Sequence, residues 1–164
     1  MPILTADSME FFSRSPEQTR RLGMRLGALL LPGDLVFLSG NLGAGKTTFV
    51  QGVAQGWGSL DSVSSPTFVI VNLYRRTDGQ TLAHLDAYRL VSAIEAEDLD
   101  LDALLARGPL LVEWAERIQA ALPGDHLLIT MRYQDEEARA MSFNPFGARY
   151  THMLKQFRVQ VLGG

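Results

Sequence analysis

The sequence contains no cysteine, which excludes disulfide bonds, thiolate nucleophiles and cysteine-based zinc sites. Histidine is scarce, and the three present, His84, His126 and His152, are scattered without the spacing of metal ligands. Uninterrupted apolar stretches are also lacking, because the longest region, residues 26–38, is broken by Pro-Gly-Asp at residues 32–34. The first residues have no basic patch followed by an apolar run, which a secretion signal needs. We therefore expect a cytoplasmic protein with no membrane contact.

An excess of charge of one sign is missing as well. Lysine and arginine total 15 and aspartate and glutamate total 18, for a formal net charge of −3. This balance predicts no large field toward nucleic acid or anionic lipid, although a local basic groove is compatible with it. With 164 residues, 46% hydrophobic and 20% charged, the chain is expected to form a single globular domain over residues 1–164.

The first clear structural signal is a helix start. Ser15 can cap a helix, Pro16 suits its first position, and Gln18 can complete a capping box. Four leucines then recur at helical spacing, at Leu22, Leu26, Leu29 and Leu30. We expect this helix to end at residues 32–34.

Short apolar or β-branched runs bounded by turn residues predict strands at residues 35–38, 68–74, 110–112 and 126–131. The Asp78-Gly79 pair is a hairpin signal, so residues 81–85 are expected to return beside the preceding strand.

Helices are expected at residues 46–57, in pieces between residues 91 and 105, and at residues 114–122. The tail suggests a strand near residues 139–143, a helix near residues 148–155 and a last strand at residues 157–161. Strands alternating with helices, plus one hairpin, predict an α/β sandwich. Its sheet should have central parallel strands with antiparallel additions, covered by helices.

The strongest signal is the segment Gly40-Asn41-Leu42-Gly43-Ala44-Gly45-Lys46-Thr47, which matches the P-loop pattern in full. An expected strand precedes it and an expected helix follows it, as the mechanism requires. Its glycines allow successive N–H groups to face phosphate oxygens, and the helix N-terminus adds partial positive charge. Lys46 can then reach the β- and γ-phosphates, while the Thr47 hydroxyl can bind Mg²⁺. The segment predicts a nucleoside triphosphate site.

The base of that nucleotide is inferred from an absence. GTPases usually recognise guanine through an Asn/Thr-Lys-x-Asp segment after a strand, and the chain has no such segment. We therefore expect ATP with Mg²⁺.

A P-loop site also needs a carboxylate at the end of a second buried strand. Glu113 follows the clean apolar run at residues 110–112, and Asp86 follows a strand that His84 interrupts. Both acids can face the crevice outside the carboxyl ends of the sheet. Each also has a structural alternative, since Glu113 could cap the next helix and Asp86 could cap or pair with Arg89.

Other candidates depend more on context. Trp114 directly follows Glu113, and a tryptophan there is more often a core residue than a ligand contact. His84 is interpreted as an ordinary strand residue. Thr67 lies in Ser-Ser-Pro-Thr between the P-loop helix and a strand, where a hydroxyl can sense the γ-phosphate or simply cap a turn.

Four motifs in order make a recognisable combination. They are the P-loop continued by Thr48, Ser65-Pro66-Thr67-Phe68, His84-Leu85-Asp86-Ala87-Tyr88-Arg89-Leu90 and Leu111-Val112-Glu113-Trp114. Together they resemble the TsaE (YjeE) family of small bacterial ATPases of tRNA threonylcarbamoyladenosine synthesis. The resemblance extends from about Ser15 to Arg139.

The resemblance implies a P-loop NTPase fold, a three-layer sandwich with helices on both faces of a mixed sheet. It also implies ATP hydrolysis that supports threonylcarbamoyl transfer to adenosine 37 of tRNAs reading ANN codons. TsaB and TsaD would be the partners, and contact with tRNA would be indirect.

Residue roles transfer by position. Lys46 would hold the phosphates, Thr47 and Glu113 would serve Mg²⁺, Thr67 would be the switch hydroxyl, and Asp86 would be a second acid near the metal and the attacking water. The implied nucleotide contacts are Asn41, Leu42, Gly43, Ala44, Gly45, Lys46, Thr47, Thr48, Trp114, Pro16, Ala138 and Arg139. One departure is Asn41, where the family usually has aspartate, so a negative charge beside the phosphates is missing.

Two other functions remain compatible with the motifs. A small-molecule or nucleotide kinase could use Asp86 as the base for an acceptor hydroxyl. A nucleotide-dependent binding module with negligible turnover would need Lys46 and Thr47 but not the two acids.

Overall fold

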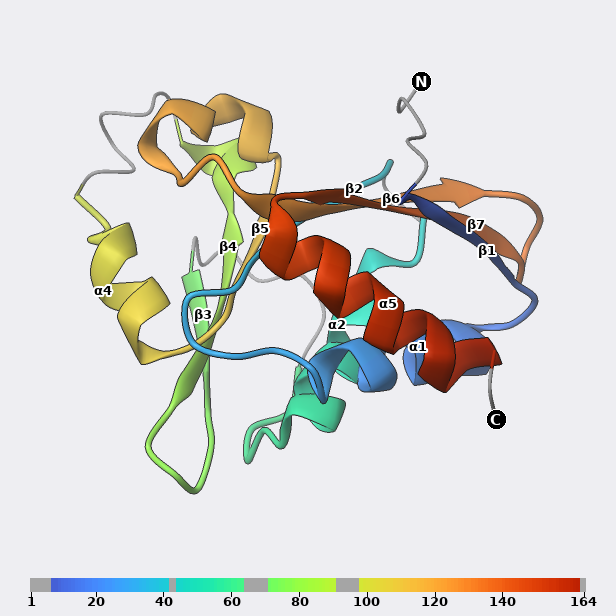
Figure 1. Cartoon of the computed structure of the whole chain (residues 1–164), viewed down its shortest axis with the longest axis horizontal. Coiled ribbons are helices and arrows are strands. Elements are labelled where there is room, and N and C mark those ends of the chain that lie inside the picture. The colour runs from blue at the N-terminus through green and yellow to red at the C-terminus, as the bar shows by residue number, and fades with distance from the viewer. Residues whose placement is uncertain (1–6, 42–43, 64–70, 91–97, 163–164) are drawn as a thin grey trace.

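The structure is a computed structural model that describes residues 7–41, 44–63, 71–90 and 98–162 (Figure 1). Its strands are β1 (Met9–Ser13), β2 (Leu35–Ser39), β3 (Val71–Arg75), β4 (Thr81–Asp86), β5 (Leu110–Glu113), β6 (His126–Tyr133) and β7 (Arg139–Phe146). Its α-helices are α1 (Pro16–Gly27), α2 (Lys46–Trp57), α4 (Leu101–Arg107) and α5 (Ala148–Leu162). Short 3₁₀ turns occupy η1 (Ala87–Arg89), η2 (Ala115–Arg117) and η3 (Gln119–Ala121).

The seven strands form one sheet in the order β1-β7-β6-β2-β5-β4-β3. The central strands β6, β2, β5 and β4 run parallel to one another. Antiparallel pairs complete both sides, with β3 against β4 and β7 between β6 and β1. The predicted mixed sheet is therefore confirmed, and the carboxyl ends of β2, β5 and β4 meet at one edge.

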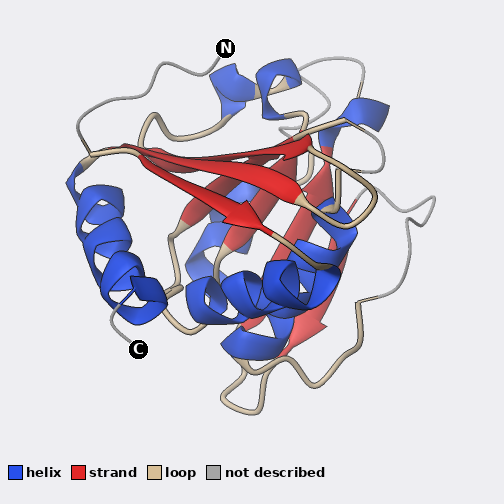
Figure 2. Cartoon of the chain, turned by 90° about the vertical axis from the view of Figure 1, so that its right-hand side faces the viewer, coloured by secondary structure: helices blue, strands red, loops and turns tan. Residues whose placement is uncertain are grey.

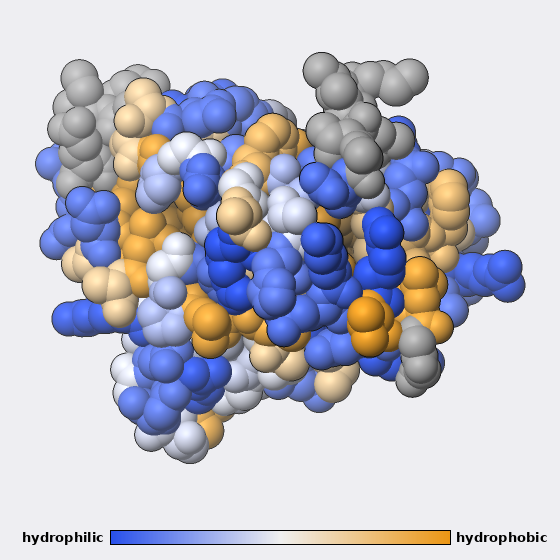
Figure 3. All heavy atoms as spheres, viewed as in Figure 1, coloured by the Kyte–Doolittle hydropathy of each residue, from blue (hydrophilic) through white to orange (hydrophobic). Residues whose placement is uncertain are grey.

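Helices cover both faces of this sheet (Figure 2). In β2, Val36 and Leu38 belong to the core under α1, α2 and α5, while Leu35 and Phe37 belong to the core under α4 and the 3₁₀ turns. The strand is apolar on both sides because it is buried on both sides. Figure 3 shows mostly hydrophilic residues on the outer face near α1 and α5.

Glycines bring α1 and α2 into direct main-chain contact. A Cβ atom on Gly52 would lie 2.0 Å from the Arg20 carbonyl oxygen, and one on Gly56 would lie 1.9 Å from that of Met24. On the facing helix, a Cβ on Gly27 would lie 2.1 Å from the Val53 oxygen. Only residues without a side chain permit this approach. The contact fixes α2, and with it the P-loop, against α1.

The predicted N-terminal helix is confirmed at its start. The Ser15 hydroxyl accepts a hydrogen bond from the Gln18 N–H at 3.2 Å, and Pro16 is the first helical residue. The Gln18 side chain reaches back to the Arg14 N–H, one residue before the donor of a standard capping box. The helix ends at Gly27 rather than at residues 32–34, and a turn follows it.

Three expectations for the rest of the chain were wrong or incomplete. The last strand at residues 157–161 does not exist, because α5 continues to Leu162 and buries Phe157 fully. Residues 114–122 form two 3₁₀ turns instead of one helix, since Trp114 has a left-handed φ of 59°. The edge strand β1 was not predicted. Residues 68–70 and the helical pieces expected at residues 91–97 lie outside the described residues.

The C-terminal helix is tied to the start of β2. The Arg149 guanidinium donates to both carboxylate oxygens of Asp34, at 3.0 and 2.8 Å. The neighbouring Tyr150 hydroxyl accepts a hydrogen bond from the Leu35 N–H at 2.8 Å. These contacts hold the strand that leads into the P-loop. In the described part of the chain, no helix has the length and hydropathy needed to cross a membrane.

Candidate nucleotide site

The P-loop connects β2 to α2 as the sequence predicted. Gly45 has a φ of 95°, which side chains disfavour, and α2 begins immediately after it at Lys46. At Gly40 a Cβ would lie 2.7 Å from the Met131 carbonyl oxygen, so the loop also passes close to β6. The amino end of α2 therefore faces the loop with its unpaired N–H groups and partial positive charge. Leu42 and Gly43 lie outside the described residues.

Arg139 braces the loop from β7. Its Nε donates to the Ala44 carbonyl oxygen at 3.0 Å, and its Nη1 donates to the carbonyl oxygens of Asp135 and Ala138 at 2.7 and 2.8 Å. The guanidinium also lies 5.0 Å from the centre of the Tyr133 ring. The structure thus places Arg139, one of the implied nucleotide contacts, against the main chain of the loop.

Pro16 lies near the same edge of the sheet. It follows β1, whose last residue, Ser13, pairs with Arg139 in β7. Two of the implied nucleotide contacts, Pro16 and Arg139, are thus linked through the pairing of β1 with β7.

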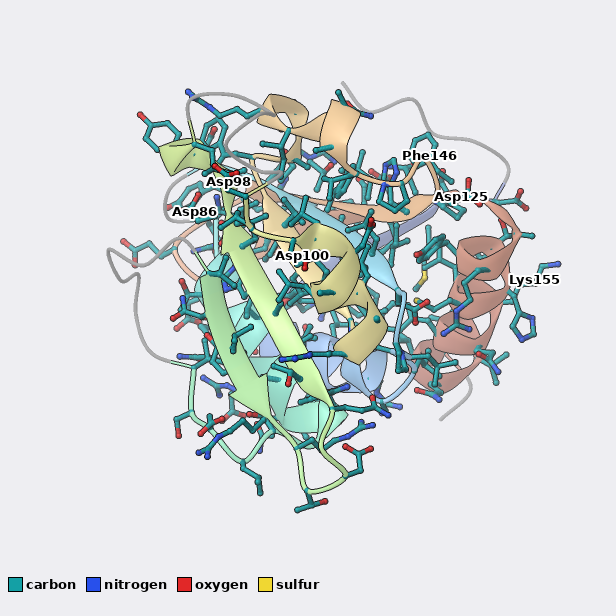
Figure 4. The ribbon with its side chains drawn as sticks, turned by 90° about the vertical axis from the view of Figure 1, so that its left-hand side faces the viewer. Asp86, Asp98, Asp100, Asp125, Phe146 and Lys155 are labelled. Atoms are coloured by element: carbon teal, nitrogen blue, oxygen red, sulfur yellow. The ribbon has the colours of Figure 1, made fainter. Side chains whose placement is uncertain are left out.

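The two candidate acids lie side by side. Asp86 ends β4 and is the register partner of Glu113 at the end of β5, which in turn pairs with Leu38 of β2. Figure 4 shows Asp86 at the end of its strand. The sequence prediction that both carboxylates reach one edge of the sheet is confirmed by this register.

Glu113 joins the P-loop lysine to a histidine. Lys46 Nζ lies 3.1 Å from Oε1, and His84 Nε2 lies 2.7 Å from Oε2. The side chains are only 14 to 16% exposed. His84, which sequence reasoning treated as an ordinary strand residue, is therefore part of the site. The sequence did carry a signal for this position. Side chains alternate between the two faces of a strand, so His84 and Asp86, two residues apart, lie on the same face of β4.

Opposing effects set the pKa of Glu113. Burial raises it, but the hydrogen bond and charge of His84 and the charge of Lys46 outweigh burial, so the pKa is lowered. The carboxylate is consequently ionised at neutral pH. An ionised carboxylate held by the Lys46 ammonium group and the His84 ring is a weak base, so Glu113 is better suited to binding a cation or orienting water than to removing a proton.

Asp86 has a second role as a helix cap. One of its carboxylate oxygens accepts a hydrogen bond from the Tyr88 N–H at 3.0 Å at the start of η1. The capping alternative considered from the sequence is thus present. Asp86 therefore caps η1 and also lies beside Glu113 at the end of the neighbouring strand.

Trp114 is exposed rather than part of the core. It is 40% accessible, lies 5.1 Å from the Tyr88 ring, and has Lys46 Nζ 5.9 Å from its ring centre. An aromatic face beside the P-loop lysine is positioned for ligand contact, which favours the functional interpretation over the core one.

A cavity of about 410 Å³ adjoins the P-loop and the end of β6. It is lined by Ser39, Gly40, Asn41, Ala44, Lys46, Trp114, Glu116, Thr130, Met131, Arg132 and Tyr133. The volume is within the range of small-molecule sites. Sequence reasoning missed residues 130–133, because their approach to the loop depends on the pairing of β6 with β2. It also missed Glu116, which lies in η2 just after β5.

The donor set is compatible with Mg²⁺. Thr47 lies in the first turn of α2, and Glu113 and Asp86 are carboxylates at the adjacent strand ends. Among the described residues, no group of three or more histidine, cysteine or acidic side chains forms an all-protein cage. Mg²⁺ usually binds one or two carboxylates together with water and substrate phosphates, so this sparse oxygen set fits it. The candidate switch residue Thr67 lies outside the described residues.

Comparison with known proteins agrees with this geometry. The family model of the threonylcarbamoyl adenosine biosynthesis protein TsaE matches residues 13–141. The tRNA threonylcarbamoyladenosine biosynthesis protein TsaE of Bacillus subtilis is 40% identical over 144 residues, which cover 87% of this chain and 89% of that protein. The protein of the same name from Nostoc is 35% identical, with 92% and 95% covered.

The Streptomyces coelicolor protein of that name is 50% identical over 110 residues, with 66% and 74% of the two chains covered. Among solved structures, the crystal structure of Bacillus subtilis YdiB aligns with a TM-score of 0.75 and 30% identity, covering 94% of this chain and 96% of that one. The sheet order, the P-loop and these matches together show that the chain has a P-loop NTPase fold and belongs to the TsaE family of tRNA threonylcarbamoyladenosine biosynthesis proteins.

Proposed function

We propose that the protein is the ATP-binding and ATP-hydrolysing subunit that supports threonylcarbamoylation of adenosine 37 in tRNAs reading ANN codons. It would act in the cytoplasm with partners of the TsaB and TsaD type, and reach tRNA through them. The observation that carries the proposal is the contact of Lys46 with Glu113, 3.1 Å apart at the junction of the P-loop and β5. A P-loop lysine beside a strand-end carboxylate is the arrangement that a nucleotide hydrolase requires.

The division of labour follows from position. The loop N–H groups and Lys46 would bind the phosphates. Lys46 would break its contact with Glu113 in order to do so. Thr47 and Glu113 would hold Mg²⁺, which supplies charge neutralisation of the phosphates when it is bound. Asp86 would orient the attacking water, Thr67 would respond to the γ-phosphate, and Trp114 would contact the nucleotide.

The isolated chain is expected to be slow. Arg139 donates to the Ala44 carbonyl oxygen, and Arg132, in the wall of the adjoining cavity, pairs with Glu10. With both guanidinium groups held by other partners, partner proteins would have to supply the arginine that stabilises the transition state.

Steady-state ATP hydrolysis, measured with and without the two partner proteins and tRNA, tests the proposal. We expect stimulation by the partners, and loss of threonylcarbamoyl from adenosine 37 when the gene is deleted. Absence of both effects would contradict the proposed function.

The cavity beside the loop keeps one alternative open. It could hold the acceptor of a small-molecule kinase, with Asp86 as the base. Transfer of labelled phosphate to a metabolite rather than to water would favour that function. Binding of nucleotide without turnover under all conditions would instead favour a binding module.

A further inference from the structure

Glu113 divides its two carboxylate oxygens between two partners. Oε1 faces Lys46 at 3.1 Å, and Oε2 faces His84 at 2.7 Å. His84 is on β4, which pairs in parallel with β5, so it is held by the sheet and not by the P-loop. One contact of the carboxylate therefore belongs to the loop helix and the other to the neighbouring strand.

The two contacts respond differently to a nucleotide, an argument that rests on the proposed function. When Lys46 turns to the phosphates, Glu113 loses the cation at Oε1 and is left near a polyanion. Because this carboxylate is only 16% exposed, leaving its charge without a partner costs substantial free energy. The His84 contact uses the other oxygen, so the departure of Lys46 does not break it.

We propose that His84 is a positioning residue that holds Glu113 at Oε2 and thereby lets Lys46 leave Oε1 without displacing the carboxylate. Its role is exerted through Glu113 and requires no contact with nucleotide. The same contact keeps Glu113 oriented for hydrolysis after the exchange.

A double-mutant cycle on the full chain with its partners tests this inference. The variants are His84→Ala, Glu113→Gln and the double variant, with His84→Gln placing an amide N–H where the imidazole Nε2 lies. We expect His84→Ala to lower kcat by about tenfold to a hundredfold, as for other groups that orient a ligand residue. ADP affinity should stay within about threefold, and His84→Gln should recover most of the rate.

The decisive comparison is of the effect of His84→Ala in the wild-type and Glu113→Gln backgrounds. It uses the thermal unfolding midpoints of the nucleotide-free variants, because Glu113→Gln is itself expected to remove hydrolysis. If His84 acts through Glu113, adding His84→Ala to Glu113→Gln should lower the midpoint by less than His84→Ala lowers it in the wild type. His152→Ala, which removes an exposed histidine on α5, is the control and should match the wild type.

The outcomes separate the two levels of the proposal. Hydrolysis in the wild type with unchanged turnover in His84→Ala, or additive losses in the double variant, would overturn the role of His84 alone. A failure of His84→Gln to recover activity, together with lost ADP binding, would also overturn it by indicating a structural role. A wild-type chain that never hydrolyses ATP would contradict the proposed function, and this inference with it.

Discussion

At the scale of single residues, the P-loop lysine and the carboxylate at the end of β5 form an ion pair, with Lys46 Nζ 3.1 Å from Glu113 Oε1. The pairing is buried enough for both charges to matter, since each side chain is about one-seventh exposed. Affinity for nucleotide and the chemistry of hydrolysis are therefore expected to depend on different members of the site.

Substitutions at the three charged positions separate binding from hydrolysis. Lys46→Ala should abolish nucleotide binding, because the phosphates lose their cation. Glu113→Ala and Asp86→Ala should abolish hydrolysis but change affinity by less than about tenfold, since acids mainly serve the transition state. Calorimetry with ADP and a phosphate-release assay measure the two properties.

Asp86→Asn is the matched variant. Asparagine can still cap η1 through its side-chain oxygen, as Asp86 does toward the Tyr88 N–H, while the charge is removed. If Asp86→Asn loses hydrolysis as Asp86→Ala does, the charge is needed. Full activity in Asp86→Asn would reduce Asp86 to a cap.

His126 makes stability depend on pH. The residue is 7% exposed, and its ring centre lies 3.9 Å from that of Phe37 and 4.6 Å from that of Phe146. Burial lowers its pKa, and the contrary effects of Gly124 and Asp125 are smaller. The unfolded chain, with a histidine pKa of about 6.5, binds this proton more readily than the folded chain. Stability should therefore fall as the pH drops through about 6.5 toward the folded pKa.

Urea unfolding at pH 7.5 and pH 5.5 checks this effect. The loss on acidification should be smaller in His126→Phe, which keeps the stacked ring without the titrating nitrogen. Equal losses in the two proteins would show that carboxylates alone determine the acid dependence.

At the scale of elements, the crossing of α1 and α2 depends on the absence of side chains. Gly52→Ala should lower the free energy of unfolding by at least about 1–3 kcal/mol, because its Cβ would overlap the Arg20 carbonyl oxygen at 2.0 Å. The displaced α2 should also weaken ADP binding. Gly124→Ala is the control, as no heavy atom lies within 4 Å of a Cβ there.

Elements were predictable where the signal was local. The start of α1, the P-loop with α2 and the Asp78-Gly79 turn follow from neighbouring residues, and the structure confirms them. The end of α5 was not predictable in this way, because Val159 and Val161 suggested a strand. Packing decided otherwise, since Phe157 completes a buried stripe on a helix. The edge strand β1 was missed because its partner, β7, is distant in sequence.

The same distinction applies to the candidate site. Lys46, Glu113 and Asp86 could be located from motifs and from strand ends. The contact between His84 and Glu113 required the register of β4 with β5, and the cavity wall at Arg132 and Tyr133 required the pairing of β6 with β2. Such pairings are tertiary properties that local patterns do not encode.

At the scale of the whole molecule, Asp34 and Arg149 connect the last helix to the strand that carries the P-loop. Arg149→Ala would leave Asp34, whose side chain is 5% exposed, without its cation. Removal of one partner of a buried pair costs about 3–5 kcal/mol, and the partial exposure of Arg149 favours the lower end. Chemical unfolding measures this loss.

Arg21→Ala provides the comparison for that prediction. Arg21 pairs with Glu17 on the surface of α1, where the two side chains are 67% and 75% exposed. Exposed pairs of this kind contribute about 0–1 kcal/mol, so little change is expected. Equal effects of the two substitutions would argue against a special role for the α5 connection.

Under the proposed function, the carboxylate opposite Lys46 would act as an intramolecular competitor of the phosphates. Because the chain itself keeps this carboxylate close to the lysine, its local concentration is independent of solution conditions. An arriving nucleotide would have to displace it from Lys46, so phosphate affinity would reflect the difference between two contacts of one ammonium group.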